Sequence, residues 1–316
     1  MKLRVRSVTW EAEGILSFEL VHPEGLPLPV FEAGAHIDVR IPGGLSRRYS
    51  LCNTPGERTH YRIAVLRVPE SRGGSRAMHE RVHAGDFIEA SEPRNFFPLD
   101  DSAGHALLLA GGIGVTPLLA MVERLQASGR PFAMHYCTTS PERTAFAGRL
   151  QPLAAQGIVT HHHDRGDPRN GLDIARLLRD PAPGTHLYYC GPAGFMKAVK
   201  AASAHWPAGT VHFEYFGAEP QAAPVNVGAC ADTVPVHLLR SGRTVQVSPV
   251  QTLLQALRDA GVECESSCEA GVCGTCRVDY SEGEPEHNDL ILNEEERARS
   301  VLLCCGRART PLSLDL

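Results

Sequence analysis

Three cysteines in one short stretch are the residues whose types and spacing most clearly specify a chemistry. Cys268, Cys273 and Cys276 lie in the segment S-C-E-A-G-V-C-G-T-C at C-x4-C-x2-C spacing. Thiolates on one tight loop can converge on a single soft metal centre, and this spacing predicts a plant-type [2Fe–2S] cluster. The adjacent Cys304 and Cys305 compete for the fourth ligand position, and spacing alone does not separate them.

A structural zinc site is the alternative for these thiols. Zinc sites commonly combine two short C-x-x-C pairs, whereas the fourth cysteine here lies about thirty residues downstream. Gly271 and Gly274 let the backbone bend closely around a cluster and direct N–H groups at sulfur. The spacing therefore favours iron and sulfur over zinc, and we expect Cys264 to be a bystander.

A cluster that moves single electrons needs a source of electrons, and two motifs can serve a flavin. In Arg47-Arg-Tyr-Ser50, an arginine can pair with phosphate, the tyrosine can pack on the ring and the serine can bond a ring edge. Downstream, Arg72-Gly-Gly-Ser-Arg76 precedes a probable helix and is a second phosphate-binding candidate. The alternatives are a solvated edge strand and an ordinary surface turn.

Two further turns have the context of a dinucleotide site. Ala110-Gly-Gly-Ile-Gly-Val-Thr-Pro117 follows a predicted strand and opens a predicted helix, with Pro117 at the first helical position. It is not G-x-G-x-x-G, and a plain strand–turn–helix is the alternative. Cys190-Gly-Pro192 ends another predicted strand, where ligands of open α/β sheets bind.

Glu214-Tyr-Phe216 ends the last strand of this region, and its aromatic side chains can cover a flat ring or pack in a core.

The histidine run His161–His163 is not expected to bind metal. Consecutive residues on a strand point to alternate faces, so three neighbours do not converge easily. We expect solvated or hydrogen-bonded side chains at a strand end.

Changes in hydrophobic periodicity divide the chain into four segments. Residues 1–102 alternate like an antiparallel β-barrel, and residues 103–218 alternate short apolar strands with helices, which predicts a doubly wound parallel sheet. Residues 219–229 are small, proline-containing and aperiodic, as in a linker. Residues 230–316 contain a hairpin, a short helix and the cysteine loop. In the second segment we expect helices at Pro117–Ala127 and Asp173–Arg179, among others.

Composition narrows the function class. The 316 residues are 43% hydrophobic and 21% charged, and the net charge of -5 argues against nucleic acid as the main partner. No apolar run is long enough for a membrane span, and the start lacks a signal-peptide core. The ten cysteines are then expected to be reduced, some as metal ligands, in a cytoplasmic protein.

Taken in order, these motifs resemble those of the phthalate dioxygenase reductase family, which includes the vanillate demethylase reductases. Further similar segments are Ser91–Leu99, His205–Glu214 and Val301–Ala308. The resemblance covers nearly the whole chain. It implies an FMN-binding β-barrel, an NADH-binding α/β domain and a C-terminal plant-type [2Fe–2S] ferredoxin domain with the α+β β-grasp fold.

The resemblance also implies roles for single residues. The expected FMN contacts are Arg47, Tyr49, Ser50, Ala64, Leu66, Gly74 and Ser75. Phe216 is expected near the flavin, and Cys304 is expected as the fourth cluster ligand, with Cys268, Cys273 and Cys276.

The nucleotide contacts follow in the same way. The expected residues around the dinucleotide are Gly111, Gly112, Gly114, Thr116, Cys190, Gly191 and Pro192. Cys190 should face the nicotinamide, and Thr116 should lie near the nicotinamide or flavin. Thr138, Thr139, Ser140 and Arg143 lie where the adenosine ribose is expected. Because hydroxyls and an arginine can accept a 2′-phosphate, NADPH stays open beside NADH.

The implied function is a reductase that passes electrons from NADH through FMN and the cluster to a partner Rieske-type non-haem iron oxygenase. The partner is implied because the chain has no Rieske Cys/His pattern of its own. Acidic residues around the cysteine loop can steer a basic docking face, or simply form a solvated surface. Alternatives are a reductase for a haem monooxygenase or a ferric chelate, and a non-enzymatic binding protein with a structural metal. The substrate belongs to the oxygenase.

Overall fold

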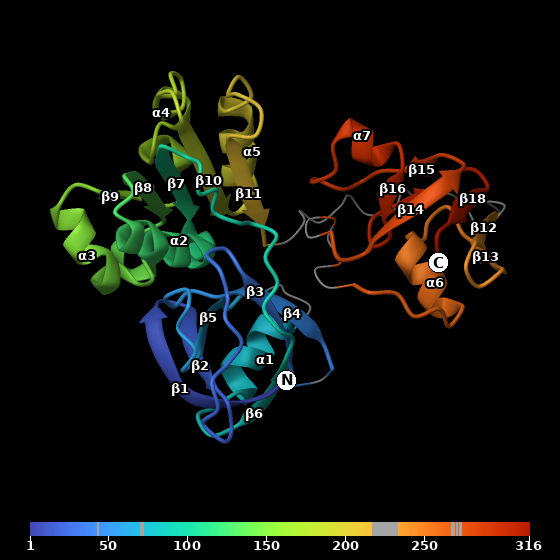
Figure 1. The fold of residues 1–316 in the computed structure, drawn as a ribbon, viewed down its shortest axis with the longest axis horizontal. Helices are drawn as coiled ribbons and strands as arrows, with labels where there is room; N and C mark the ends of the chain where they lie inside the picture. Colours follow the sequence, from blue (N-terminus) through green and yellow to red (C-terminus); the bar gives the residue numbers. More distant parts are fainter. Residues whose placement is uncertain (43, 70–72, 217–232, 267–268, 270, 272–273) are drawn as a thin grey trace. The chain divides into compact units, whose positions relative to one another are not determined.

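The computed structural model describes residues 1–42, 44–69, 73–216, 233–266, 269, 271 and 274–316. It divides the chain into two compact units, Met1–Phe216 and Gly217–Leu316 (Figure 1). The predicted linker, residues 219–229, lies outside the described residues.

The N-terminal part of the first unit is the predicted antiparallel β-barrel. Its strands are β1 (Lys2–Ala12), β2 (Ile15–Val21), β3 (His36–Arg40), β4 (Ser46–Ser50), β5 (Tyr61–Leu66) and β6 (Phe87–Ala90). They pair in the order β4-β3-β6-β1-β2-β5. Alternate residues of each strand point inward, so Leu3, Phe18 and Ile37 form part of a buried core. The two end strands, β4 and β5, also contact each other, which closes the barrel at a seam without a hydrogen-bonded ladder. Helix α1 (Gly74–Arg81) packs on β5 through the buried Ala77 and Met78.

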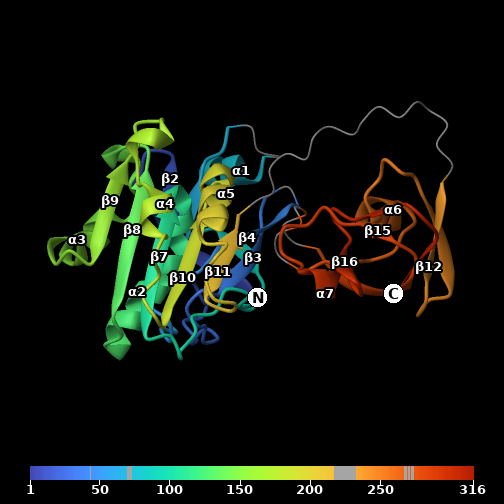
Figure 2. The same cartoon turned by 90° about the horizontal axis from the view of Figure 1, so that it is seen from above.

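The predicted doubly wound sheet follows. Its parallel strands are β7 (His105–Gly111), β8 (Phe132–Thr138), β9 (Val159–His163), β10 (Thr185–Gly191) and β11 (Val211–Tyr215). Their order is β11-β10-β7-β8-β9, which can be followed across Figure 2. The chain order reverses between β7 and β10, and such a switch point is where open α/β sheets bind ligands.

Helices cover both faces of this sheet. Helices α2 (Val115–Ser128) and α3 (Ala147–Ala155) pack on one face in a core that includes barrel residues. Helices α4 (Ile174–Leu177) and α5 (Ala193–Ala202) pack on the other. The barrel and the sheet therefore share one continuous core, which fixes the barrel against the face that carries α2.

Two sequence expectations in this region were wrong in detail. A 3₁₀ turn, η1 (Gly112–Gly114), precedes α2, so Pro117 is the third helical residue and not the first. Proline is tolerated there because the first-turn N–H groups have no partner within the helix. The helix expected over Asp173–Arg179 is the single turn α4, which starts one residue later because the Asp173 side chain caps it by accepting the Arg176 N–H.

The second unit has the predicted α+β architecture. Its sheet has the order β13-β12-β18-β14-β16, in which β12 and β18 are parallel and the other pairs antiparallel. The strands are β12 (Val234–Leu238), β13 (Arg243–Val247), β14 (Arg277–Glu282), β16 (Ser300–Leu302) and β18 (Leu312–Leu314). Helix α6 (Leu253–Asp259) begins with a capping box between Thr252 and Gln255 and buries its leucines in the core.

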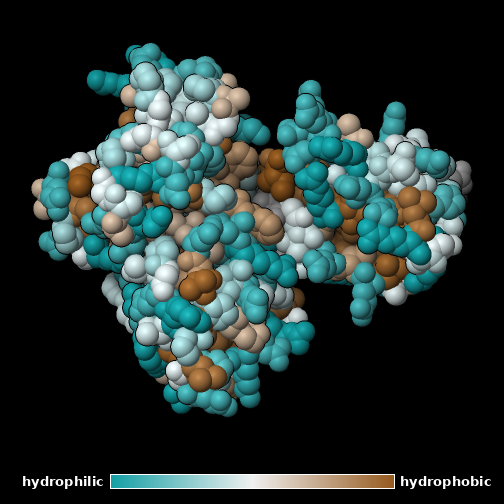
Figure 3. All heavy atoms as spheres, viewed as in Figure 1, coloured by the Kyte–Doolittle hydropathy of each residue, from teal (hydrophilic) through white to brown (hydrophobic). Residues whose placement is uncertain are grey.

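Smaller elements complete this unit. Strands β15 (Pro285–Glu286) and β17 (Arg307–Ala308) form a separate pair, and α7 (Glu294–Arg297) is one helical turn. In the described part of the chain no helix has the length and hydrophobicity needed to cross a membrane. On the face drawn in Figure 3, hydrophobic residues form scattered spots within a largely hydrophilic surface.

Candidate cofactor sites

A cavity of about 250 Å³ opens at the barrel seam, between β4, β5, the start of α1 and the start of α2. All seven residues predicted to contact FMN line it, together with Thr116 and Phe216. The described residues that line it are Arg47, Arg48, Tyr49, Ser50, Ala64, Val65, Leu66, Val68, Gly74, Ser75, Ile113, Thr116 and Phe216. The fold thus brings residues from five separate sequence segments to one partly apolar pocket, a suitable environment for a flat ring.

The polar end of this cavity suits a phosphate. Helix α1 begins at Gly74, and its cap residue Gly73 has the left-handed φ of 92° that glycine favours. A Cβ at Gly74 would lie 3.2 Å from Cγ and Nε of Arg47, so glycine lets the arginine lie against the helix start. A guanidinium beside the N–H groups of a helix N-terminus makes an anion site.

A buried hydroxyl–carboxyl pair lies beside the cavity. Ser50 Oγ donates to Glu214 Oε2 over 3.1 Å, and both residues are buried. The bond joins the barrel strand β4 to β11, which is an edge strand of the parallel sheet. Such a pair can hold or pass a proton next to a bound ring. The sequence reasoning missed Glu214, although a carboxylate at a buried strand end was a usable signal.

The glycine-rich turn after β7 contacts the end of β10. A Cβ at Gly114 would lie 2.2 Å from the carbonyl oxygen of Cys190, and one at Gly111 would lie 2.8 Å from Pro192 Cδ and 3.2 Å from Gly191 Cα. These glycines are therefore required by packing inside the protein. Gly112 differs, because it has a φ of 52° and its Cβ would meet no atom of the described residues within 4 Å. Of the three glycines in this turn, it alone leaves room for a ligand to approach the backbone.

Cys190 and Thr116 have different surroundings. Burial raises the pKa of the fully buried Cys190 thiol, and the nearby Glu214 raises it further, so the thiol is neutral. Thr116 lines the cavity and donates from Oγ1 to the carbonyl oxygen of Ile113 over 3.1 Å. Cys190 is not among the described residues that line the cavity, so its contact with a nicotinamide stays a prediction.

Two of the four residues predicted at the adenosine ribose, Thr138 and Arg143, already have side-chain partners. Arg143 forms a bidentate pair with Glu13, at 3.1 Å from Nη2 to Oε1 and 3.3 Å from Nε to Oε2. Thr138 Oγ1 lies 2.8 Å from Thr144 Oγ1 and 2.9 Å from His163 Nδ1. A 2′-phosphate would have to compete with a carboxylate for Arg143.

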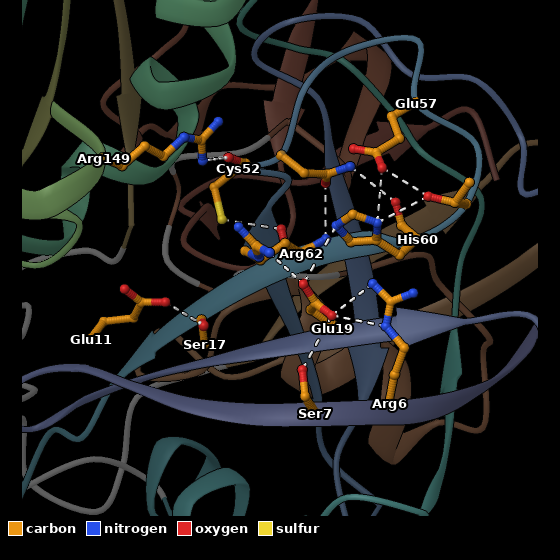
Figure 4. A network of polar contacts seen from close by, with 12 residues as sticks. Arg6, Ser7, Glu11, Ser17, Glu19, Cys52, Glu57, His60, Arg62 and Arg149 are labelled. Atoms are coloured by element: carbon orange, nitrogen blue, oxygen red, sulfur yellow. Dashed lines mark hydrogen bonds and ion pairs between the residues drawn. The ribbon is translucent and has the colours of Figure 1, made fainter. Parts of the chain in front are cut away.

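An ion-pair network holds β5 in place (Figure 4). The Glu19 carboxylate of β2 accepts from Arg6 of β1, with 2.7 Å between Nη2 and Oε2, and from Arg62 of β5. Burial alone would raise the pKa of Glu19, but these two arginines lower it to about 2. The network therefore joins the strand that carries Ala64 and Leu66 to its neighbours.

The described cysteines of the second unit differ in where their thiols point. The Gly271 N–H donates to Cys304 Sγ over 3.2 Å, and the Cys304 N–H donates to Cys276 Sγ over 3.5 Å. The Cys305 thiol instead donates to the carbonyl oxygen of Leu302 over 3.7 Å. Buried sulfurs that accept N–H bonds suit cluster ligands. Cys268 and Cys273 lie outside the described residues.

Packing against the cysteine loop explains one of its glycines. Gly271 has a φ of 70°, and a Cβ there would lie 2.8 Å from Cys305 Sγ. The Leu290 N–H donates to the Gly271 carbonyl oxygen over 3.0 Å, and Asn288 Nδ2 donates to the Cys305 carbonyl oxygen over 3.2 Å. The segment after β15 therefore supports both the cysteine loop, at Gly271, and the adjacent Cys304 and Cys305, through the Cys305 carbonyl.

The histidine run behaves as expected from strand geometry. His161 and His163 stack on one face of β9, with ring centroids 6.4 Å apart. His162 Nε2 lies 2.9 Å from Nδ1 of His135 on the neighbouring strand β8. The three consecutive side chains do not converge on one point.

Comparisons with known proteins cover the whole chain. Residues 236–309 match the family described as 2Fe-2S iron-sulfur cluster binding domain. The tert-butanol monooxygenase / tert-amyl alcohol desaturase reductase subunit of Aquincola tertiaricarbonis is 46% identical over 323 residues, which cover 100% of this chain and 96% of the relative.

Two solved structures are also similar over 100% of this chain. The structure of phthalate dioxygenase reductase, titled as a modular structure for electron transfer from pyridine nucleotides to [2Fe-2S], is 42% identical, with 98% of its chain covered and a TM-score of 0.77. An intact type IV self-sufficient cytochrome P450 monooxygenase is 39% identical, with 41% of its chain covered and a TM-score of 0.85.

Proposed function

This chain belongs to the phthalate dioxygenase reductase family, and we propose that it carries electrons from NADH through FMN and a [2Fe–2S] cluster to a separate Rieske-type oxygenase. The protein is an oxidoreductase, as its full-length relatives are. The observation that carries the proposal is the cavity at the barrel seam. It collects every predicted FMN contact beside Thr116 of the glycine turn, in a chain that also buries Cys276 and Cys304.

The residues around the cavity fit an FMN. Arg47 and the N-terminus of α1 would hold the phosphate, and Tyr49, Ala64 and Leu66 would flank the ring. When bound, FMN accepts the electron pair of a hydride and releases electrons singly, which a nicotinamide cannot do. The protein binds and orients the groups, and the buried Ser50–Glu214 pair holds a proton beside the ring position.

The nucleotide is proposed to lie at the switch point between β7 and β10. Gly112 leaves open space at the start of α2, where a pyrophosphate can approach N–H groups. The Glu13–Arg143 pair supports NADH over NADPH, because it places a carboxylate on the cation that a 2′-phosphate would use. The sequence left both nucleotides open, and this contact favours NADH.

The geometry supports Cys304 over Cys305 as the fourth ligand, with Cys268, Cys273 and Cys276. Cys304 Sγ accepts the Gly271 N–H, and the Cys304 N–H donates to Cys276 Sγ. The Cys305 thiol instead donates to a carbonyl oxygen. A bound cluster would carry one electron at a time, and the N–H donors would tune its potential.

Reduction of a purified acceptor tests the proposal. With NADH and no oxygen, the protein should reduce the Rieske centre of an oxygenase, followed by electron paramagnetic resonance. A ferric cytochrome P450 tested in parallel represents the second candidate function, which the likeness to the self-sufficient P450 favours. Rapid reduction of the haem protein together with failure on Rieske oxygenases would make the proposed partner wrong.

A further inference from the structure

Two histidines and one aspartate, side chains of types that can bind metal, meet at the end of the parallel sheet opposite the glycine turn. His186 lies near the start of β10, His212 near the start of β11, and Asp100 in the segment between β6 and β7. One donor atom from each lies within 4.8 Å of the other two. None of the three lines the cavity at the barrel seam, so the proposed electron path does not use this group.

Two of the separations between these donor atoms are close to those of a metal centre. His186 Nδ1 lies 3.0 Å from His212 Nε2 and 3.7 Å from Asp100 Oδ2. Ligands about 2.0–2.1 Å from a tetrahedral zinc lie roughly 3.3–3.4 Å from each other. The two separations fall on either side of that value, so small side-chain movements would bring both contacts to it.

Neighbouring groups orient two of the three side chains, His212 and Asp100. The Tyr188 ring stacks on His212, with centroids 4.6 Å apart and planes 11° from parallel. The Tyr188 hydroxyl accepts the Asp100 N–H over 2.9 Å. Ser102 donates to Asp100 Oδ1 from N and from Oγ, over 2.7 and 2.6 Å, which leaves Oδ2 toward His186. Supporting bonds of this kind are typical of metal sites, where they fix ligand orientation.

A hydrogen bond between two neutral histidines is the plain alternative, and the chain contains a matched example of it. His135 Nδ1 lies 2.9 Å from His162 Nε2, also across two adjacent parallel strands of the same sheet. Within the described residues, that pair is not part of any three-ligand group. Asp100 is therefore the feature that separates the two histidine pairs.

We propose that Asp100, His186 and His212 bind one divalent transition-metal ion of the zinc class, with water completing the coordination. Imidazole nitrogens and one carboxylate oxygen suit such an ion. The ion would fasten the segment that leaves the barrel to the first residues of β10 and β11. Its role is structural, so electron transfer from NADH does not require it.

Zinc titration of the untagged, full-length holoprotein tests this site. Calorimetry should detect one zinc equivalent with a dissociation constant of about 1 µM or tighter. His186→Asn and the milder Asp100→Asn should each weaken binding at least about 10-fold. His162→Asn, from the matched pair, should bind zinc as the wild type does, and the cluster absorbance should stay unchanged throughout.

Other results would overturn the site. They are no binding by the wild type at about 100 µM zinc, equal loss in His162→Asn, or no loss in Asp100→Asn. Because Asp100 is partly exposed, its variant should fold even if the His186 variant does not. NADH-dependent reduction of the flavin should be the same with and without zinc, which keeps this test independent of the proposed function.

Discussion

Side-chain direction distinguishes two cysteines that sequence spacing cannot separate. Cys304 and Cys305 are adjacent and both buried. The Cys304 sulfur accepts an N–H from Gly271, whereas the Cys305 thiol donates to Leu302. A thiolate needs donors, and a thiol can use an acceptor, so the two environments suit a ligand and a non-ligand respectively.

Single serine substitutions should therefore have different effects on the cluster. Cys304→Ser should abolish the brown absorbance and the bound iron, because a hydroxyl is a poor ligand for this site. Cys305→Ser should keep both. Iron content per protein and the visible spectrum measure the outcome, and loss of the cluster in Cys305→Ser but not in Cys304→Ser would reverse the assignment.

The contacts of Ser50 show where sequence reasoning ended. The motif Arg47–Ser50 identified the serine, because polar residues at the end of a strand suit a flavin edge. Its partner Glu214 is 164 residues away, and no local pattern predicts that pairing. The same limit applies to the exposed pair of Glu13 and Arg143, since side-chain partners from two domains depend on how the domains are packed.

Glycine at position 114 sets the distance between the turn after β7 and the end of β10. Gly114→Ala should destabilise the first unit by about 1–3 kcal/mol and weaken NADH binding, because the new Cβ would overlap the Cys190 carbonyl. Gly148→Ala is the matched control, since its Cβ meets no described atom within 4 Å and it lies in α3. Equal melting temperatures for both variants would refute the packing role.

The Glu19 network predicts an acid-dependent stability of the barrel. The folded pKa of about 2 lies below the ordinary 4.5, so the ionised carboxylate favours the folded state. This contribution is complete above pH 4.5 and is lost as the pH falls toward 2. Glu19→Gln should cost about 1–3 kcal/mol at pH 7, and the difference should shrink steadily below pH 4.5.

Fluorescence can follow this unit selectively, because both tryptophans, Trp10 and Trp206, belong to it. Denaturant unfolding at several pH values gives the comparison. Glu13→Gln removes an exposed pair and should change stability little. A Glu19→Gln difference that stays constant from pH 7 to about pH 3 would contradict the assigned pKa.

Elements with strong periodicity were predictable, and their exact starts were not. The parallel strands appeared as short apolar runs because both of their faces are covered by helices. The start of α2 was misplaced because the 3₁₀ turn of Gly112–Gly114 has no distinct hydrophobic pattern. The helix predicted over Asp173–Arg179 was longer than α4 because apolar residues continue past the end of α4, where Leu178 is buried.

The charges of the second unit bear on its partner. Glu263 and Glu265, near the cysteine loop, are exposed, while Glu269 pairs with Arg258 and Glu286 with Arg309. The charge available for docking is therefore smaller than the acidic sequence suggests. Raising salt from about 50 to 500 mM should still slow electron transfer to the oxygenase several-fold. Stopped-flow reduction of the oxygenase measures it, and a salt-independent rate would exclude charge steering.

Anaerobic reduction by NADH tests the whole electron path most directly. The purified protein should be yellow-brown, and NADH should bleach the flavin absorbance and then produce the resonance signal of a reduced [2Fe–2S] cluster. In Cys304→Ser the flavin should still bleach and no cluster signal should form. A colourless protein that binds zinc in the cysteine loop, or a flavin that NADH reduces without any reduction of an intact cluster, would contradict the account.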